Sequence, residues 1–329
     1  MHGKTSEQVS AGALGMIIVE DVVSPLLQNV SPSSRPGISE WLNQDLVLIL
    51  QHTSKTFLAN GVQTESLLLK RNQWYRLRIL LTNPTGSGGD ITISSASACE
   101  IYDIAYDGVY TTSVPGVQRN SGIIPLLTGA SRLDVAIQCQ QPVDFRYGEA
   151  MARIVLVDGE APDIVPTPFA GNREKWVPQR PSYLLDLTRY RPSKVDEVKM
   201  TASSVSGYSW NPDVFMDTIA LNSVVEWTIS SSSSHPLHLH MFHMQVMRDC
   251  GPYITGQYYD TISTSNKCVV RFMPQTHSGR CVLHCHHLGH EDKGAMTQLM
   301  ITGPPSSLQS STSPAAAAAT CEEWSSFRR

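Results

Sequence analysis

The stretch HCHHLGHEDKGAM at residues 284–296 contains four histidines and one cysteine, Cys285, within its first seven positions. A second stretch, HPLHLHMFH at residues 235–243, contains four more histidines. Eight of the 11 histidines therefore lie in two short blocks, and each block contains a His-x-His pair. Side chains two residues apart on a β-strand lie on the same face, so both blocks predict strands that present imidazoles together.

The alternation of side chains along a strand separates the candidate metal ligands into two sets. The first set consists of four histidines on one face: His238, His240, His284 and His286. Imidazole groups suit copper, zinc, iron or nickel. On the opposite face, Cys285 with His235 and His290 forms the His2Cys set of a blue-copper electron-transfer site. Because Cys285 is bonded to both His284 and His286, a short covalent route joins the two predicted sites.

Other interpretations of these histidines are weaker. A common zinc site would have paired cysteines or a His-Glu-x-x-His helix, and neither spacing occurs. A lone histidine is more often structural than a ligand, so we predict no metal at His2, His52 or His277. His243 and His287 neighbour the ligands without completing the alternation, and we expect them to contact solvent or the ligands themselves.

The composition argues against a nucleic-acid-binding protein and against a membrane-spanning one. The 25 Lys and Arg against 29 Asp and Glu give a net charge of -4, which offers no basic surface for nucleic acid. The longest apolar runs, at residues 46–50 and 77–81, are far shorter than the roughly 18–20 residues that span a bilayer, so no membrane span is predicted. The first residues, MHGKT, do not read as a signal peptide.

The chain predicts an all-β fold with about two domains. Charged residues make up 16%, below the roughly 25% of an average domain, while Ser, Thr, Gly and Pro are frequent. Turn signals such as Asn60-Gly61, Gly88-Gly89 and Asp107-Gly108 separate short β-prone segments, as in a sandwich or barrel. The strands expected in the first domain are 45–51, 67–69, 74–81, 90–94, 101–105 and 133–138. Those expected in the second are 183–187, 224–229, 238–247, 267–272 and 297–302.

Proline-rich segments at residues 22–40 and 161–181 are the predicted linkers. The apolar run at 12–21 is interpreted as the last strand of a preceding domain. The final residues, 304–329, are rich in Pro, Ser and Ala and predict a disordered tail.

Together the two histidine blocks resemble the copper signature of the multicopper oxidases, the family of laccases, ascorbate oxidase and the bacterial copper efflux oxidases. The resemblance implies two tandem cupredoxin-like Greek-key β-sandwiches. Residues 22–160 would be the second cupredoxin domain, without copper, and residues 161–303 the third, with the copper ligands. Residues 1–21 would be a remnant of the first.

The resemblance also implies an activity and a role for each ligand. His235, Cys285 and His290 would hold a type 1 copper that takes electrons from a small-molecule or metal-ion reductant, such as a phenol or an aromatic amine. His238 would bind a type 2 copper, and a type 3 pair would be bound by His240, His284 and His286. This trinuclear cluster would reduce dioxygen to water, with Glu291 relaying protons. The family implies a secreted or periplasmic enzyme.

The sequence departs from the family pattern at the position of the axial type 1 ligand. Ten residues after the cysteine the family often has Met, Leu or Phe, whereas this chain has Ala295, followed by Met296. Loss of an axial ligand destabilises oxidised copper, so we expect a high reduction potential unless Met296 reaches the metal.

The second departure concerns the cluster, which in a three-domain oxidase needs two more His-x-His pairs. Only His2 and His52 precede His235. The opening MHGKTSEQVSAGALGMIIVED resembles the segment after the second pair of the first domain, where the efflux oxidases read HPHxHGKT. We therefore expect a truncated sequence that is inactive alone, with His2 as a non-ligating residue.

Two alternative functions stay open at this point. A copper-binding or electron-transfer cupredoxin without oxidase activity would need only the His2Cys set, and the four further histidines favour oxidase ancestry. A two-domain enzyme that completes its cluster across a trimer interface would need a His-x-His pair in the first domain, where residues 46–133 contain only His52.

The chain has seven cysteines: Cys99, Cys139, Cys250, Cys268, Cys281, Cys285 and Cys321. With Cys285 as a ligand, six remain, which permits disulfides such as Cys250 with Cys268 or Cys99 with Cys139. Spacing does not fix the pairing.

Overall fold

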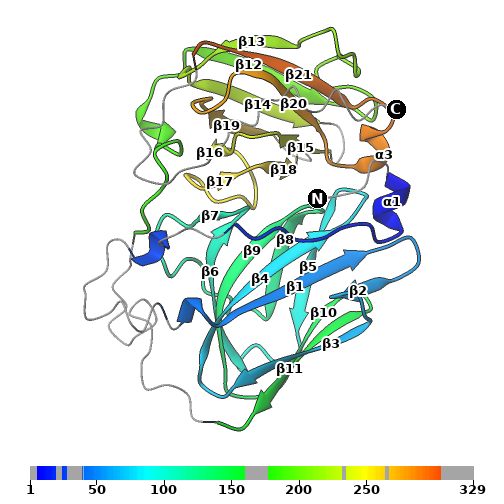
Figure 1. Ribbon diagram of the computed structural model, residues 1–329, viewed down its shortest axis with the longest axis vertical. Helices are drawn as coiled ribbons and strands as arrows, with labels where there is room; N and C mark the ends of the chain where they lie inside the picture. The colour runs from blue at the N-terminus through cyan, green and yellow to red at the C-terminus, as the bar shows by residue number, and fades with distance from the viewer. Residues whose placement is uncertain are drawn as a thin grey trace. The chain divides into compact units, whose positions relative to one another are not determined.

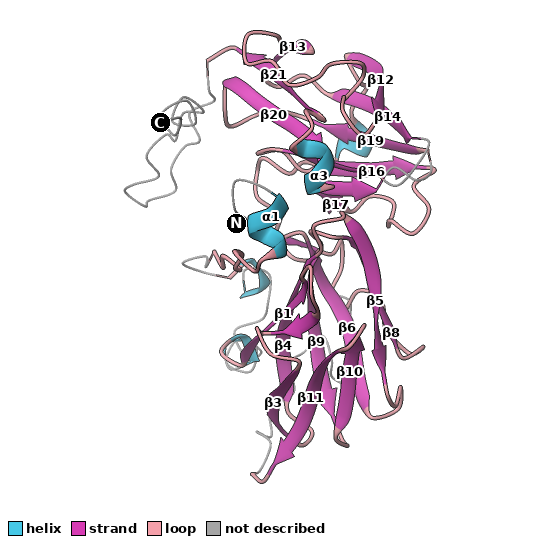
Figure 2. Cartoon of the chain, turned by 90° about the vertical axis from the view of Figure 1, so that its right-hand side faces the viewer, coloured by secondary structure: helices cyan, strands magenta, loops and turns pink. Residues whose placement is uncertain are grey.

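The computed structural model describes residues 6–19, 24–27, 39, 41–159, 177–231, 235–263 and 267–304. The chain divides into two compact units, residues 1–180 and 181–329. Regular structure in the described residues is almost entirely β-strand (Figure 1; Figure 2), so the predicted all-β fold is confirmed. His2, Cys321, residues 161–176 of the second linker, most of the first linker and the tail from residue 305 lie outside the described residues.

The first unit is a sandwich of two sheets. The six-stranded sheet has the order β2-β1-β4-β9-β6-β7, with β1 (Asp45–His52), β2 (Phe57–Ala59), β4 (Trp74–Thr82), β6 (Cys99–Tyr106), β7 (Val109–Tyr110) and β9 (Arg132–Cys139). The five-stranded sheet has the order β3-β11-β10-β5-β8, with β3 (Thr64–Lys70), β5 (Ser87–Ile93), β8 (Ile123–Thr128), β10 (Val143–Tyr147) and β11 (Ala150–Val157). A short helix α1 (Ser6–Ser10) and a 3-10 helix η1 (Pro25–Leu27) precede β1.

The second unit is also a two-sheet sandwich. One sheet has the order β12-β14-β19-β16-β17, with β12 (Lys194–Met200), β14 (Val225–Ser231), β16 (Met244–Arg248), β17 (Tyr258–Tyr259) and β19 (Cys268–Phe272). The other has the order β13-β21-β20-β15-β18, with β13 (Asp217–Ala220), β15 (Pro236–Leu239), β18 (Thr261–Ser263), β20 (Gly279–Cys285) and β21 (Met296–Thr302). The 3-10 helix η3 (Leu187–Arg189) precedes β12, and helix α3 (Leu288–Glu291) lies between β20 and β21.

The two sandwiches repeat one topology. Strand β2 has no counterpart among the described strands of the second unit, and the other pairings match. Strand β1 pairs in parallel with β4, as β12 does with β14. Strand β3 pairs in parallel with β11, as β13 does with β21. By this order, β15 and β20 of the second unit correspond to β5 and β10 of the first. Both histidine blocks lie on β15 and β20 or next to them in the chain, whereas β5 and β10 contain no histidine.

Alternating burial explains why these segments form strands. Along β3, Leu67 and Leu69 are buried while Ser66 and Lys70 are exposed, which is the pattern of a strand with one face on the core. At the predicted turn between β6 and β7, Asp107 and Gly108 both have positive φ, of 48° and 80°, as a tight hairpin requires.

Gly88-Gly89 is not a turn, and that prediction is wrong. Both glycines lie inside β5, where a Cβ at Gly88 would stand 2.1 Å from the carbonyl oxygen of Leu126 on β8. Close approach of the β8 backbone explains Gly88, and the ring of Tyr147 on β10, 2.6 Å from a Cβ at the next position, explains Gly89.

Three strand predictions are corrected by the structure. Residues 183–187 form turns that lead into η3, because Asp186 caps that helix through the backbone N–H of Thr188. The single strand expected at 238–247 is two strands, β15 and β16, in opposite sheets, and Met241 between them has φ of 68°. Residues 12–19 form no strand apart from one bridge at Leu14.

The described residues contain two disulfides, and both are pairings that the sequence permits. Cys99 joins Cys139, its direct partner across β6 and β9, and Cys250 joins Cys268. The thiols of Cys281 and Cys285 are buried outside these disulfides.

Removing the first disulfide should destabilise the first unit. In the double variant Cys99→Ala/Cys139→Ala we expect the free energy of unfolding of this unit to fall by about 2–4 kcal/mol, because the bridge restricts the unfolded chain over a separation of 40 residues. Urea unfolding of the variant and the wild type measures the difference. Added reductant should shift this transition in the wild type alone, and an equal shift in both proteins would contradict the assignment.

Candidate metal centre

The structure brings Cys285, His235 and His290 together in what we call the Cys285 group. The Sγ atom of Cys285 lies 3.5 Å from Nδ1 of His235 and 3.7 Å from Nδ1 of His290. The two Nδ1 atoms are 3.0 Å apart. Cys285 is fully buried and His235 nearly so. One sulfur and two nitrogens facing a common point make a ligand set for a single metal ion.

Three elements position this group. His235 directly precedes β15, Cys285 ends β20, and β15 and β20 pair so that Leu237 lies opposite Cys285. Just after β20 the single-turn helix α3 reverses the chain (Figure 1), and the backbone N–H of His290 bonds to the carbonyl of His287 at 2.9 Å. This turn returns the His290 ring to the cysteine five residues earlier.

The other predicted ligands also converge, in what we call the four-histidine group: His238, His240, His284 and His286. His238 and His284 are direct partners across β15 and β20. The Nε2 atoms of His240 and His284 are 3.0 Å apart. The ring of His286 lies 5.5 Å from that of His238 and 5.6 Å from that of His284, between centroids. Such clustering of imidazole nitrogens suits one or more transition-metal ions.

Burial keeps these imidazoles neutral, the form that ligates a metal. It lowers the pKa of His290 to about 4 and the pKa of His235 below its usual value. It also holds the pKa of His284 well below its usual value, and the neighbouring histidines add to the effect. Burial raises the pKa of the Cys285 thiol to about 11, so a metal that binds the thiolate releases a proton.

Glu291 is the acidic group beside the four-histidine group. Its Oε2 atom lies 3.5 Å from Nδ1 of His284, and it ends helix α3. Burial raises the pKa of Glu291 to about 7. A carboxyl group with this pKa can both hold and release a proton near neutral pH.

The position of a possible axial ligand is occupied by Ala295. Ala295 is fully buried and its carbonyl accepts a 2.9 Å hydrogen bond from the backbone N–H of Cys285. Met296 lies opposite His284 across β20 and β21, so its side chain is on the face of the four-histidine group and not on that of Cys285.

This arrangement predicts the effect of adding a thioether at the Cys285 group. In a copper-loaded Ala295→Met variant we expect a lower reduction potential than in the wild type, because an axial thioether stabilises oxidised copper. Met296→Leu, on the other face, should leave the potential unchanged. A spectroelectrochemical titration measures both, and a shift confined to Met296→Leu would contradict the assignment of faces.

The remaining described histidines lie outside both groups. His52 stacks on Phe57, and Nδ1 of His277 lies 2.6 Å from the hydroxyl of Thr276. His287 stacks parallel to His290, with ring centroids 3.7 Å apart, which is a contact of the kind expected for a histidine beside the ligands. Gly289 leaves room for the His287 ring, since a Cβ there would stand 3.3 Å from it.

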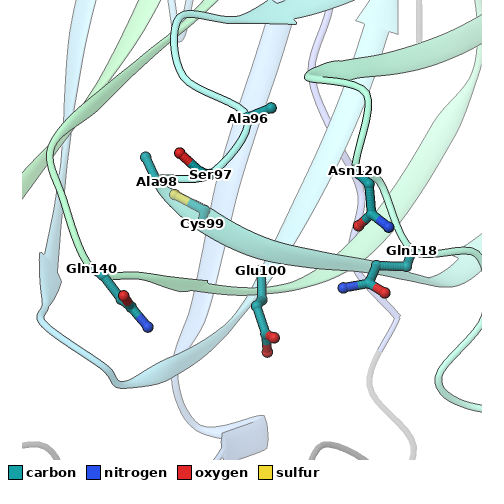
Figure 3. A pocket seen from close by; sticks show the side chains of 8 residues that line it. All are labelled: Ala96, Ser97, Ala98, Cys99, Glu100, Gln118, Asn120 and Gln140. Atoms are coloured by element: carbon teal, nitrogen blue, oxygen red, sulfur yellow. The ribbon is translucent and has the colours of Figure 1, made fainter.

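The first unit contains a separate hollow of about 340 Å³ (Figure 3). Amide and carboxyl side chains line it, among them Glu100, Gln118, Asn120 and Gln140. Within the described residues, the groupings of His, Cys, Asp or Glu able to hold a metal ion lie in the second unit.

The comparisons with known proteins agree with this geometry. Residues 177–304 match the family model described as multicopper oxidase. The match spans the second sandwich with both ligand groups, so this part of the chain is similar to the multicopper oxidases. No curated protein sequence matches the chain.

Solved structures of multicopper oxidases share the fold. A multi-copper oxidase from Pediococcus acidilactici is 19% identical, with a TM-score of 0.64 over 82% of this chain and 62% of that one. The McoA multicopper oxidase from Aquifex aeolicus is 16% identical, with a TM-score of 0.69 over 92% of this chain and 74% of that one. A multicopper oxidase from Campylobacter jejuni, described as a metallo-oxidase, is 17% identical, with a TM-score of 0.65 over 92% of this chain and 70% of that one. These similarities confirm the predicted tandem of cupredoxin-like sandwiches. The chain spans less than two thirds of the length of the Pediococcus enzyme.

No helix among the described residues is both long enough and apolar enough to cross a membrane.

Proposed function

We propose that this chain is the copper-binding portion of a laccase-like multicopper oxidase. Cys285, His235 and His290 would hold a type 1 copper. In the four-histidine group, His238 would bind a type 2 copper and the other three histidines a type 3 pair. The full enzyme would oxidise phenols, aromatic amines or metal ions and reduce dioxygen to water.

One observation supports this proposal most strongly. The residues His284-Cys285-His286 place one side chain in the Cys285 group and two in the four-histidine group, so three consecutive residues connect two ligand sets. An isolated electron-transfer cupredoxin would need the first set alone, and the second set therefore favours the oxidase. Bound copper would supply one-electron redox chemistry at the first set and dioxygen reduction at the second.

The residues of the chain prepare both sites for this chemistry. Desolvation lowers the pKa values of His235, His284 and His290, so these imidazoles offer lone pairs, and Cys285 is fully buried. The Cys285 thiol gives up its proton when a metal binds. Glu291 can hold a proton at its carboxyl group, 3.5 Å from Nδ1 of His284, and we propose that it relays protons to the second site.

The four-histidine group supplies half of the ligands that a trinuclear cluster of this family needs. We therefore propose that the chain alone loads the type 1 site and does not reduce dioxygen. We also propose that the full enzyme works outside the cytoplasm, in the periplasm or secreted, which suits the two disulfides.

Copper content measured together with oxygen consumption tests this proposal. The purified chain, loaded with copper and given a phenolic reductant, should hold one type 1 copper at the Cys285 group, with any further copper at the four-histidine group, and consume no oxygen. Four tightly bound coppers with steady oxygen consumption would contradict the incomplete cluster, and would show that another copy of the chain completes it. No tightly bound copper would contradict the proposal as a whole.

A further inference from the structure

We propose that Asp260 and Thr261 act as a positioning pair that fixes His238 in the tautomer with its proton on Nδ1. The Nε2 atom of His238 then presents its lone pair to the four-histidine group. This inference rests on the proposed function for the identity of the metal, but the tautomer itself is a property of the metal-free chain.

Two polar groups contact the Nδ1 side of the His238 ring. Nδ1 lies 3.0 Å from the backbone carbonyl oxygen of Asp260 and 3.0 Å from the hydroxyl oxygen of Thr261. The Thr261 hydroxyl in turn donates a 2.8 Å hydrogen bond to Oδ1 of Asp260. Thr261 is 1% exposed and its hydroxyl is therefore shielded from bulk water.

Counting protons determines which tautomer these contacts select. A carbonyl oxygen and an ionised carboxylate only accept hydrogen bonds, and a hydroxyl has a single proton to donate. The Thr261 hydroxyl gives its proton to Asp260, so it faces Nδ1 of His238 with a lone pair. Nδ1 thus meets two acceptors and must carry the proton, so the ring lone pair that can ligate a metal is on Nε2.

The sheet holds this arrangement in place. His238 and Thr261 are direct partners across β15 and β18, so their side chains lie on the same face. The Asp260 carbonyl also accepts from the backbone N–H of Leu239, at 3.2 Å, which fixes its direction. In the same group, Nδ1 of His284 lies 3.2 Å from the carbonyl oxygen of Cys285, while its Nε2 faces His240. His284 therefore also has an acceptor at Nδ1 and its Nε2 directed into the group.

Thr261→Val removes the hydroxyl acceptor while it keeps the side-chain shape. Loss of such a ligand-orienting partner typically weakens metal affinity by about 10–100-fold. Asp260→Asn tests the same mechanism differently: its amide can donate to the Thr261 hydroxyl, which frees the hydroxyl proton to point at Nδ1 and favours the wrong tautomer. Thr297→Val, at a buried threonine of β21 in the same sheet, is the matched control.

The experiment has two readouts, both on the full chain in a Cys285→Ser background so that zinc binds at the four-histidine group alone. Nitrogen-15 NMR of the metal-free protein reports which ring nitrogen of His238 is protonated. Calorimetric titration with zinc reports affinity. We expect the proton on Nδ1 in the parent, zinc affinity lower by about 10–100-fold in Thr261→Val and in Asp260→Asn, and no change in Thr297→Val.

A proton on Nε2 of His238 in the parent would overturn the inference. So would unchanged zinc affinity in both Asp260→Asn and Thr261→Val, or in whichever of them folds. Failure of the proposed function looks different, because the absence of a type 1 copper at Cys285 would leave the His238 tautomer and the zinc result as expected.

Discussion

We expect Cys285→Ser to remove the intense blue absorption of the copper-loaded chain completely. The blue colour of a type 1 site requires a thiolate ligand, and Cys285 is the sulfur that faces Nδ1 of both His235 and His290. A serine hydroxyl of similar shape cannot replace it. The measurement is the visible spectrum of both proteins after equal copper loading, with copper content determined in each.

The matched control is Cys281→Ser, at the other described cysteine outside the two disulfides. Cys281 is buried on the same strand, β20, and its Sγ lies 3.1 Å from the carbonyl oxygen of His240. It lies outside the Cys285 group, so this variant should keep the blue band. A band that survives in Cys285→Ser and disappears in Cys281→Ser would refute the assignment of the thiolate.

Arg119→Ala should destabilise the first unit by about 3–5 kcal/mol, because it leaves a buried carboxylate without its cation. Asp103 is completely buried, and Arg119 Nε donates to its Oδ1 at 2.9 Å while a second guanidinium nitrogen bonds Oδ2. The hydroxyl of Tyr106 also donates to this carboxylate. Urea unfolding of the first unit measures the change in the free energy of unfolding.

Two further variants distinguish the effect of burying an ion pair from the effect of the ion pair itself. Arg153→Ala breaks a pair with Asp144 at the same 2.9 Å distance but on the surface, and it should have little effect. The double variant Asp103→Leu/Arg119→Met, which removes both charges, should recover most of the stability lost in Arg119→Ala. Equal destabilisation by Arg119→Ala and Arg153→Ala would show that burial of Asp103 does not determine the effect.

Much of the fold and the grouping of candidate ligands could be predicted from the sequence. Short β-prone segments such as β3, where buried and exposed side chains alternate, and the turn at Asp107-Gly108 are local signals. These signals predict the all-β fold. The spacing of His238, His284 and Cys285 indicated two ligand groups before any contact was known. Each of these patterns depends on neighbours within a few residues.

Other features depend on contacts that the local sequence does not reveal. Residues 238–247 are predicted as one strand, and no Gly, Pro, Asn or Asp marks a turn within them, yet the chain turns at Met241 and enters the opposite sheet. Gly88 of β5 is explained by the backbone of β8, about 40 residues away in sequence. The face on which Met296 lies follows from its pairing with His284 and not from its distance to Cys285 along the chain.

The central claim, a type 1 copper at Cys285, His235 and His290, is tested most directly by the visible and EPR spectra of the full chain during stepwise copper addition. The account predicts an intense blue band and a matching type 1 EPR signal that grow together and reach their maximum when the Cys285 group holds one copper, while further copper adds no blue absorption. Copper that binds with no blue band at any loading would contradict it.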